Sequence, residues 1–316
     1  MNLLHDIALQ RLFGGLIVLL IVATIVGRLI ERRTGAERAS ATVQNLNARI
    51  NAWWVMSVVF AIAVLVGPIG SVVLFALLSF LALREFVTLV PTRPSDHRAL
   101  LWSFFLITPL QYVLVALHWY GLFTILIPVY AFLFLALRVA LSGDTTHFLE
   151  RVSAIQWALM ICVYSLSYAP ALLGLSIRGH GTAGPTLLLF LVIVVQGSDV
   201  LQYIFGKLFG RRKIAPLVSP SKTVEGFLGG VAAATLLGAL IWWATPFSVW
   251  QAGLQALIIA LTGFGGGLVM SAVKRDRGIK DFGTIIAGHG GILDRVDSLT
   301  FAAPIFFHVT RFFFGG

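Results

Sequence analysis

Two polar segments near the end of the chain carry most of the side chains that could do chemistry. The later one, "KRDRGIKDFGTIIAGHGGILDRVD" at 274–297, combines acidic, basic, histidine and glycine residues in a chain that is 58% hydrophobic. The earlier one, "GSDVLQYIFGKLFGRRKIAPLVSPSKTVEG" at 197–226, mixes carboxylates with cations and hydroxyls. Six of the 13 acidic residues lie in these segments: Asp199, Glu225, Asp276, Asp281, Asp294 and Asp297. Function is therefore expected there.

Asp294 and Asp297 are three residues apart, so they share one face if this stretch opens the last helix. Two neighbouring carboxylates repel unless a cation or a proton lies between them. Magnesium prefers oxygen ligands and often bridges substrate phosphates, so it suits this pair, with Asp281 as a third ligand and Asp199 as a fourth. The alternative is a set of ordinary ion pairs with three basic neighbours: Arg275, Lys280 and Arg295.

Several cations in the same segments are candidates for binding phosphate groups: Lys222, Lys274, Arg275 and Lys280. "SPSKT" at 219–223 places the hydroxyls of Ser219 and Thr223 around Lys222, just ahead of an apolar helix whose first backbone N–H groups favour an anion. The alternative is that these cations only anchor the chain at a membrane surface.

The glycines of "AGHGG" at 287–291 predict a tight turn, because glycine reaches positive backbone torsions and lets a ligand approach closely. Gly290 and Gly291 are therefore candidate substrate contacts, together with Arg295. His289 at the tip would contact phosphate or ribose or assist proton movement, or else hydrogen-bond within its own loop.

The rest of the chain must hold these segments, and its composition predicts an all-α polytopic membrane protein. A helix crosses the hydrocarbon layer with roughly 20 apolar residues, and about ten stretches qualify: 12–30, 52–67, 69–83, 100–117, 120–137, 153–177, 184–198, 226–245, 251–273 and 298–310. The uncharged run 51–83 is too long for one span, and Gly67 and Pro68 predict a helical hairpin rather than one long tilted helix. Residues 1–183 form the N-terminal helices and 184–316 a C-terminal catalytic region.

Ten spans also sort the basic residues strongly. Twenty of the 23 Lys and Arg residues fall on one side, and only Arg11, Arg178 and Arg311 fall on the other. Cytoplasmic loops retain positive charge, so both polar segments are expected to face the cytoplasm. The expected location is the inner membrane of a bacterium. The net charge of +10 is then explained by topology and contact with anionic membrane lipids, without nucleic-acid binding. A homo-oligomer is compatible with the sequence.

Other common motifs are absent from the sequence. There is no GxxxxGK[ST] phosphate loop, no CxxC pair and no HExxH. A transporter is disfavoured because few ionisable residues fall inside the spans.

Taken together, the two segments resemble the phosphatidate cytidylyltransferases, also called CDP-diacylglycerol synthases. The later segment, together with Ser271 just before it, matches the C-terminal motif of that family at these positions: Ser271, Lys274, Arg275, Lys280, Asp281, Gly283, His289, Gly290, Gly291, Asp294, Arg295 and Asp297. The earlier one matches its second conserved region: Asp199, Tyr203, Gly206, Gly210, Ser219, Pro220, Lys222, Thr223, Glu225 and Gly226. "LREF" at 83–86 is a weaker echo in the N-terminal half.

The resemblance implies that CTP and phosphatidate yield CDP-diacylglycerol and pyrophosphate with Mg²⁺, and that the lipid phosphate itself is the nucleophile. It implies metal ligation by Asp281, Asp294 and Asp297, with Asp199 and His289 in secondary roles. Three departures stand out: Ala287 where the family has proline, Gly267 and Met270 where it has an aspartate and a glutamate, and Gln202 where it has alanine. They leave open another lipid or polyprenyl phosphate as acceptor, or a non-catalytic homologue that binds lipid or nucleotide.

Overall fold

The computed structural model describes residues 6–34, 41–178, 183–285 and 290–315. In these residues each of the ten predicted spans coincides with a continuous helix or with a run of joined helical segments. Eight are long and apolar enough to cross a membrane, which confirms an all-α polytopic membrane architecture. The remaining two are α11, which is apolar but shorter, and α13, which carries charged residues at both ends.

The first three helices are α1 (Ile7–Thr34), α2 (Ala41–Val66) and α3 (Pro68–Val87). Only Gly67 separates α2 from α3, and its φ of 102° lies in the left-handed region that favours glycine. Pro68 occupies the first position of α3, where its missing N–H costs no helical hydrogen bond. The predicted helical hairpin is confirmed.

The next three spans are each built from two or more segments. They are Pro94–Ala116 with α4 (His97–Trp102) and α5 (Thr108–Ala116), Tyr120–Ala140 with α6 (Tyr120–Ile125) and α7 (Phe132–Ala140), and Phe148–Gly174 with α8 (Phe148–Leu159) and α9 (Leu166–Ala171). A π-helical turn joins the segments in each case. Pro109 and Pro128 lie beside or in two of these turns, and proline cannot donate the usual helical hydrogen bond.

The last four helices are α10 (Gly184–Phe209), α11 (Val224–Leu240), α12 (Val249–Asp276) and α13 (Leu293–Phe314). α10, α11, α12 and α13 pack successively side by side, and α13 also packs against α3 and α9. Gly206 and Gly226 let α10 and α11 approach closely, because a Cβ on Gly226 would lie 2.8 Å from the Gly206 Cα. A large core of buried residues extends from Val72 of α3 to Phe307 of α13.

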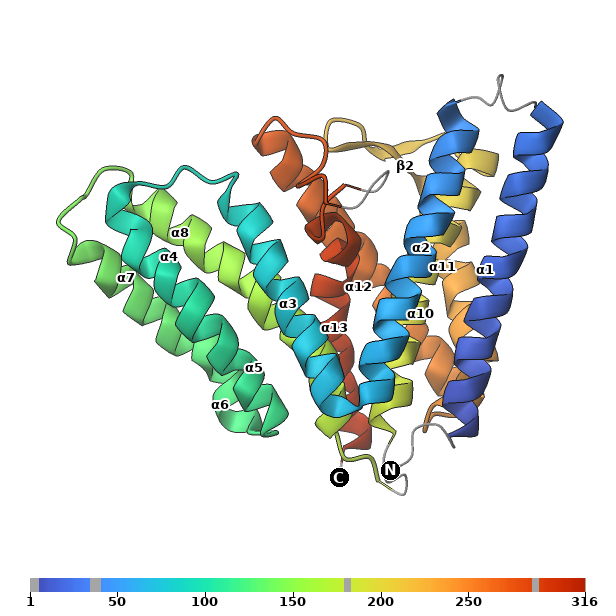
Figure 1. Ribbon diagram of the computed structural model, residues 1–316, viewed down its shortest axis with the longest axis horizontal. Coiled ribbons are helices and arrows are strands. Elements are labelled where there is room, and N and C mark those ends of the chain that lie inside the picture. The colour runs from blue at the N-terminus through green and yellow to red at the C-terminus, as the bar shows by residue number, and fades with distance from the viewer. Residues whose placement is uncertain (1–5, 35–40, 179–182, 286–289, 316) are drawn as a thin grey trace.

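A short antiparallel hairpin of β1 (Lys213–Ala215) and β2 (Ser219–Thr223) connects α10 to α11, with Lys213 opposite Thr223. The all-α prediction did not include it. Figure 1 shows this hairpin at one end of the bundle, and the start of α1 and the end of α13 at the opposite end. The carboxyl end of α12 lies at the hairpin end, so both polar segments meet there.

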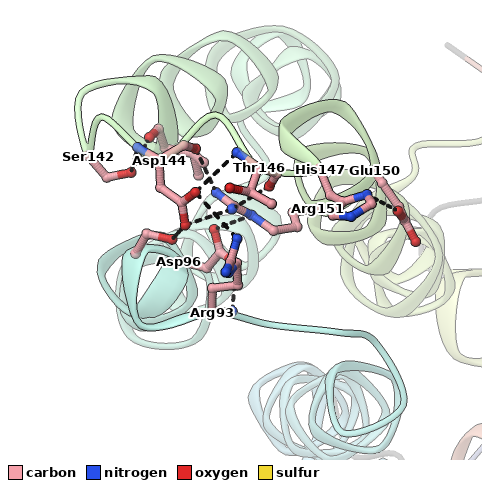
Figure 2. Close-up of polar contacts among 10 residues, drawn as sticks. Arg93, Asp96, Ser142, Asp144, Thr146, His147, Glu150 and Arg151 are labelled. Carbon is pink, nitrogen blue, oxygen red and sulfur yellow. Dashed lines mark hydrogen bonds and ion pairs between the residues drawn. The ribbon is translucent and has the colours of Figure 1, made fainter.

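The loops beside α4, α7 and α8 are joined by ion pairs around Arg151 (Figure 2). The Arg151 side chain is only 2% exposed and lies 3.2 Å from Asp96 and 2.9 Å from Asp144. It also donates to the backbone carbonyl oxygens of Asp144 and Thr146. The topology count includes Arg151 among the twenty basic residues on the expected cytoplasmic side, and the structure shows that it is a buried link between loops.

Candidate active site

The candidate site forms where α10, β2, α12 and α13 meet at the hairpin end of the bundle. Asp199 comes from α10, Lys222 from β2 and Asp297 from the second turn of α13. Asp199 and Asp297 are close enough to repel one another, and Lys222 and Arg295 attract both. The Ser298 side chain also interacts with the Asp199 carboxylate. Two segments that are distant in the sequence therefore share one electrostatic cluster.

The Lys222 ammonium is attracted by both carboxylates of the cluster, Asp199 and Asp297. Its Nζ lies 4.5 Å from the centre of the Phe264 ring and 3.5 Å from the Phe264 carbonyl oxygen. Burial lowers the pKa of the Lys222 ammonium, Asp199 and Asp297 oppose this effect, and nearby Lys274 adds to it. A partly desolvated ammonium is well suited to bind a phosphate oxygen.

Gly267 of α12 is the residue that makes room for this ammonium. A Cβ at position 267 would lie 2.9 Å from the Lys222 Nζ, 3.4 Å from the Ser298 Oγ and 4.0 Å from the Asp297 Oδ2. An aspartate side chain at 267, as in the resembled motif, would therefore point into the cluster. Met270, the other departure from that motif, is fully buried among apolar side chains.

Asp294 opens α13 as predicted, but its contacts differ from those of Asp297. Its Oδ1 lies 2.9 Å from the Lys274 Nζ, and its Oδ2 accepts the backbone N–H of Phe282 at 2.8 Å and of Gly291 at 3.0 Å. The Asp294 side chain is 3% exposed. Asp294 therefore holds together the two ends of the loop that joins α12 to α13.

Glu85 of α3 was missed as a site residue, although "LREF" contains it. Its carboxylate accepts the backbone N–H of Ile292 at 2.9 Å and of Leu293 at 2.8 Å, directly at the start of α13. Glu85 is 6% exposed. The available signals were the weak resemblance of "LREF" to the family and a single acidic residue near the end of an apolar span.

The hairpin residues have contacts within the fold. The Thr223 hydroxyl accepts the N–H of Gly226 at 3.1 Å and so caps α11, and Ser219 is buried. Arg275 donates to the carbonyl oxygens of Val218 at 3.3 Å and Ile279 at 3.0 Å, which ties the hairpin to the loop after α12. Substrate contacts for Ser219, Thr223 and Arg275 stay predictions.

The loop between α12 and α13 carries the other predicted residues. Asp281 and Lys280 are exposed, and Asp281 lies beside Gly290, whose φ is 86°. Gly291 is buried against Glu85. His289 lies outside the described residues, so its predicted role stays a prediction.

The carboxylates also bear on the predicted Mg²⁺ site. The described residues contain no group of three or more His, Cys, Asp or Glu side chains arranged to hold a metal ion. Asp199 and Asp297 nevertheless form a pair of carboxylates that repel one another. Mg²⁺ prefers such oxygen ligands, and substrate phosphates and water can complete its coordination. The pair fits the ion, whereas Asp294 is already engaged by one ammonium and two N–H groups.

Comparison with known proteins identifies the family of this chain. Residues 47–313 match the model of the "Cytidylyltransferase family". The chain belongs to the cytidylyltransferase family. The matched range contains every residue of the cluster, as well as Glu85 of α3, which contacts the start of α13. The chain is therefore a nucleotidyltransferase enzyme embedded in a membrane.

Three relatives show how far the likeness extends. The uncharacterized protein YnbB of Escherichia coli K12 is 42% identical over 96% of this chain and 99% of its own. A phosphatidate cytidylyltransferase of Bacillus subtilis 168 is 32% identical over 85% of this chain and 99% of its own. Another, of Staphylococcus haemolyticus, is 41% identical over 37% of this chain and 46% of its own. The likeness to cytidylyltransferases thus covers most of the chain.

Proposed function

We propose that this cytidylyltransferase joins CTP and phosphatidate to form CDP-diacylglycerol and pyrophosphate. The observation that carries the proposal is the cluster of Asp199, Asp297, Lys222 and Arg295 at the hairpin end of the helices. The phosphatidate cytidylyltransferase of Bacillus subtilis, which aligns with most of the chain, supports phosphatidate as the acceptor.

The reaction needs little covalent chemistry from the protein. A phosphate oxygen of the lipid attacks the α-phosphorus of CTP, the new P–O bond forms, and the bond to the β-phosphate oxygen breaks to release pyrophosphate. Several anionic oxygens crowd together in this step, so fixed cations that meet them lower its barrier. We assign this role to Lys222 and Arg295, which attract both carboxylates of the cluster. Lys274, held by Asp294, adds positive charge beside them.

Asp199 and Asp297 would hold Mg²⁺, with Asp281 approaching from the loop as a further ligand. When bound, the ion would polarise phosphate oxygens and offset the charge on the departing pyrophosphate. The carboxylates themselves fix the position of Lys222, because they attract its ammonium from both α10 and α13.

The site is proposed to face the cytoplasm, in the inner membrane of a bacterium. CTP would enter from water, and the lipid would enter from the leaflet with its headgroup at helix-end level. The positive charges gathered at this end support the orientation. A reporter fused near Arg212 should be accessible only from the cytoplasmic side, and labelling from the outside would overturn this orientation.

The test is incorporation of labelled CTP into chloroform-soluble lipid by purified protein with phosphatidate and Mg²⁺. Wild type should form product, and Asp297→Asn should lose about 10²-fold or more in kcat/KM, because one of the two half-buried carboxylates is neutralised. Asp276→Asn is the matched control, since this carboxylate is 69% exposed at the end of α12 and pairs with its neighbour Arg277. Equal activity of wild type and Asp297→Asn would refute the proposed site.

A second candidate is transfer of the cytidylyl group to another lipid phosphate or to a polyprenyl phosphate. It is favoured by Gly267, because the space that an aspartate would fill there is occupied by the Lys222 ammonium. Offering a panel of lipid phosphates in the same assay separates the two. Product from a polyprenyl phosphate but not from phosphatidate would select the second candidate. No product from any acceptor in folded protein would indicate a non-catalytic homologue.

A further inference from the structure

We propose that Glu85 is a positioning residue for nucleotidyl transfer: from α3 it caps the first turn of α13 and so fixes Asp297 relative to Lys222. This inference rests on the proposed function of the cluster, but it concerns a residue outside both polar segments. The cap joins the N-terminal helices to the catalytic end of the last helix.

The start of α13 needs an acceptor from elsewhere in the fold. The first N–H groups of any helix lack intrahelical partners, and they are usually satisfied by a side chain just before the helix. Here the preceding residue is Ile292, which has no side-chain acceptor. Both Oε atoms of Glu85 fill this role instead, at 2.9 and 2.8 Å. Its negative charge also favours the positive end of the helix dipole.

Glu85 has no competing partner that would explain its burial differently. Among the described residues, no Lys, Arg or His lies within ion-pair distance of it, so the two N–H groups are its compensation. A buried carboxylate without such compensation would be costly. The role that these contacts indicate for the carboxylate is to bind the first turn of α13.

Two loop glycines pack directly on this carboxylate. A Cβ on Gly291 would collide with the Glu85 Oε2, and one on Gly283 would lie 2.7 Å from the Oε1. Gly291 does not have a positive φ, so its backbone itself accepts alanine. Glycine at 291 is thus explained by Glu85 rather than by turn geometry. The carboxylate, the loop and the first turn of α13 form one unit.

The catalytic consequence follows from position along α13. Asp294 and Asp297 lie within the first two turns after the cap, and Asp297 faces Lys222 across the cluster. Removing the cap should let this end of the helix shift. A misplacement of about 1 Å can cost about 10²-fold in rate. We therefore expect Glu85→Ala to lower kcat about 10- to 100-fold and to change the KM for CTP less than threefold, because both carboxylate oxygens of Glu85 are engaged by backbone N–H groups of α13.

Acetate has the same heavy atoms as the part of the side chain that Glu85→Ala removes. Added sodium acetate should therefore restore part of the kcat of Glu85→Ala, while sodium chloride at equal ionic strength should not. Glu85→Gln keeps one acceptor and should retain more activity than Glu85→Ala. Arg84→Ala removes the exposed neighbour and serves as the matched control. Equal kcat values for wild type and Glu85→Ala, or a defect confined to KM, would overturn the proposal.

A second readout does not depend on activity. Gly291→Ala in the otherwise wild-type protein should lower the thermal unfolding temperature, because the added methyl group would collide with the Glu85 carboxylate. In the Glu85→Ala background the same change should have little effect, because the obstructing atoms are gone. Additive effects of the two substitutions would overturn the packing on which the inference rests. If wild type made no lipid product while this coupling held, the proposed function would fail and the cap would stand.

Discussion

Gly267→Ala gives the most direct test of the cluster, because it adds one methyl group beside the Lys222 ammonium. The new Cβ would lie 2.9 Å from Nζ, whereas ordinary van der Waals contact begins near 3.4 Å. The ammonium must therefore move by about 0.5 Å. Since a 1 Å misplacement can cost about 10²-fold, a shift of this size predicts a loss of about tenfold in kcat/KM. That loss corresponds to about 1.4 kcal/mol of transition-state stabilisation.

Gly265→Ala is the matched control for this experiment. It lies on the same helix, and a Cβ there meets nothing within 4 Å. Both substitutions exchange glycine for alanine within α12, so the gain in helix propensity is shared and cancels in the comparison. CTP incorporation should fall for Gly267→Ala and stay within twofold of wild type for Gly265→Ala. Equal losses in the two variants, or no loss at 267, would refute the placement of Lys222.

Two further predictions concern pH. Burial lowers the pKa of Lys222, so the folded state releases this proton before the unfolded state does. Its contribution to stability should therefore rise with pH between the lowered pKa and 10.5, while activity that needs the charged ammonium falls. Thermal unfolding and CTP incorporation of wild type and Lys222→Met across alkaline pH measure both trends, and the same rise in the variant would contradict them. In the loops that Arg151 joins, the hydroxyl of Ser95 and the N–H of Thr146 lower the pKa of Asp144 to about 2. The stability that Asp144 contributes is present above about pH 4 and is lost as pH falls through about 2. Asp144→Asn should destabilise the protein at neutral pH and remove part of its acid sensitivity, and an unchanged acid unfolding curve would count against this role.

Local patterns in the sequence predicted much of the fold. Apolar length placed the ten helices, and the Gly67–Pro68 pair placed the turn between α2 and α3. These predictions succeed because helix formation and turn geometry depend on residues close in sequence, and because a bilayer sets the length of each span. The two polar segments also identified the family and most residues of the candidate site.

Only the tertiary structure decided what each polar residue contacts. Their spacing did not distinguish Asp294 from Asp297. In the structure Asp294 pairs with Lys274 and accepts loop N–H groups, whereas Asp297 attracts the Lys222 ammonium. Glu85 meets the start of α13 across more than 200 residues of sequence. Arg151 is a buried link between loops, whereas its sequence position indicated only on which side of the membrane it lies. Such contacts depend on how whole helices pack, and helical periodicity specifies a face without specifying its partner.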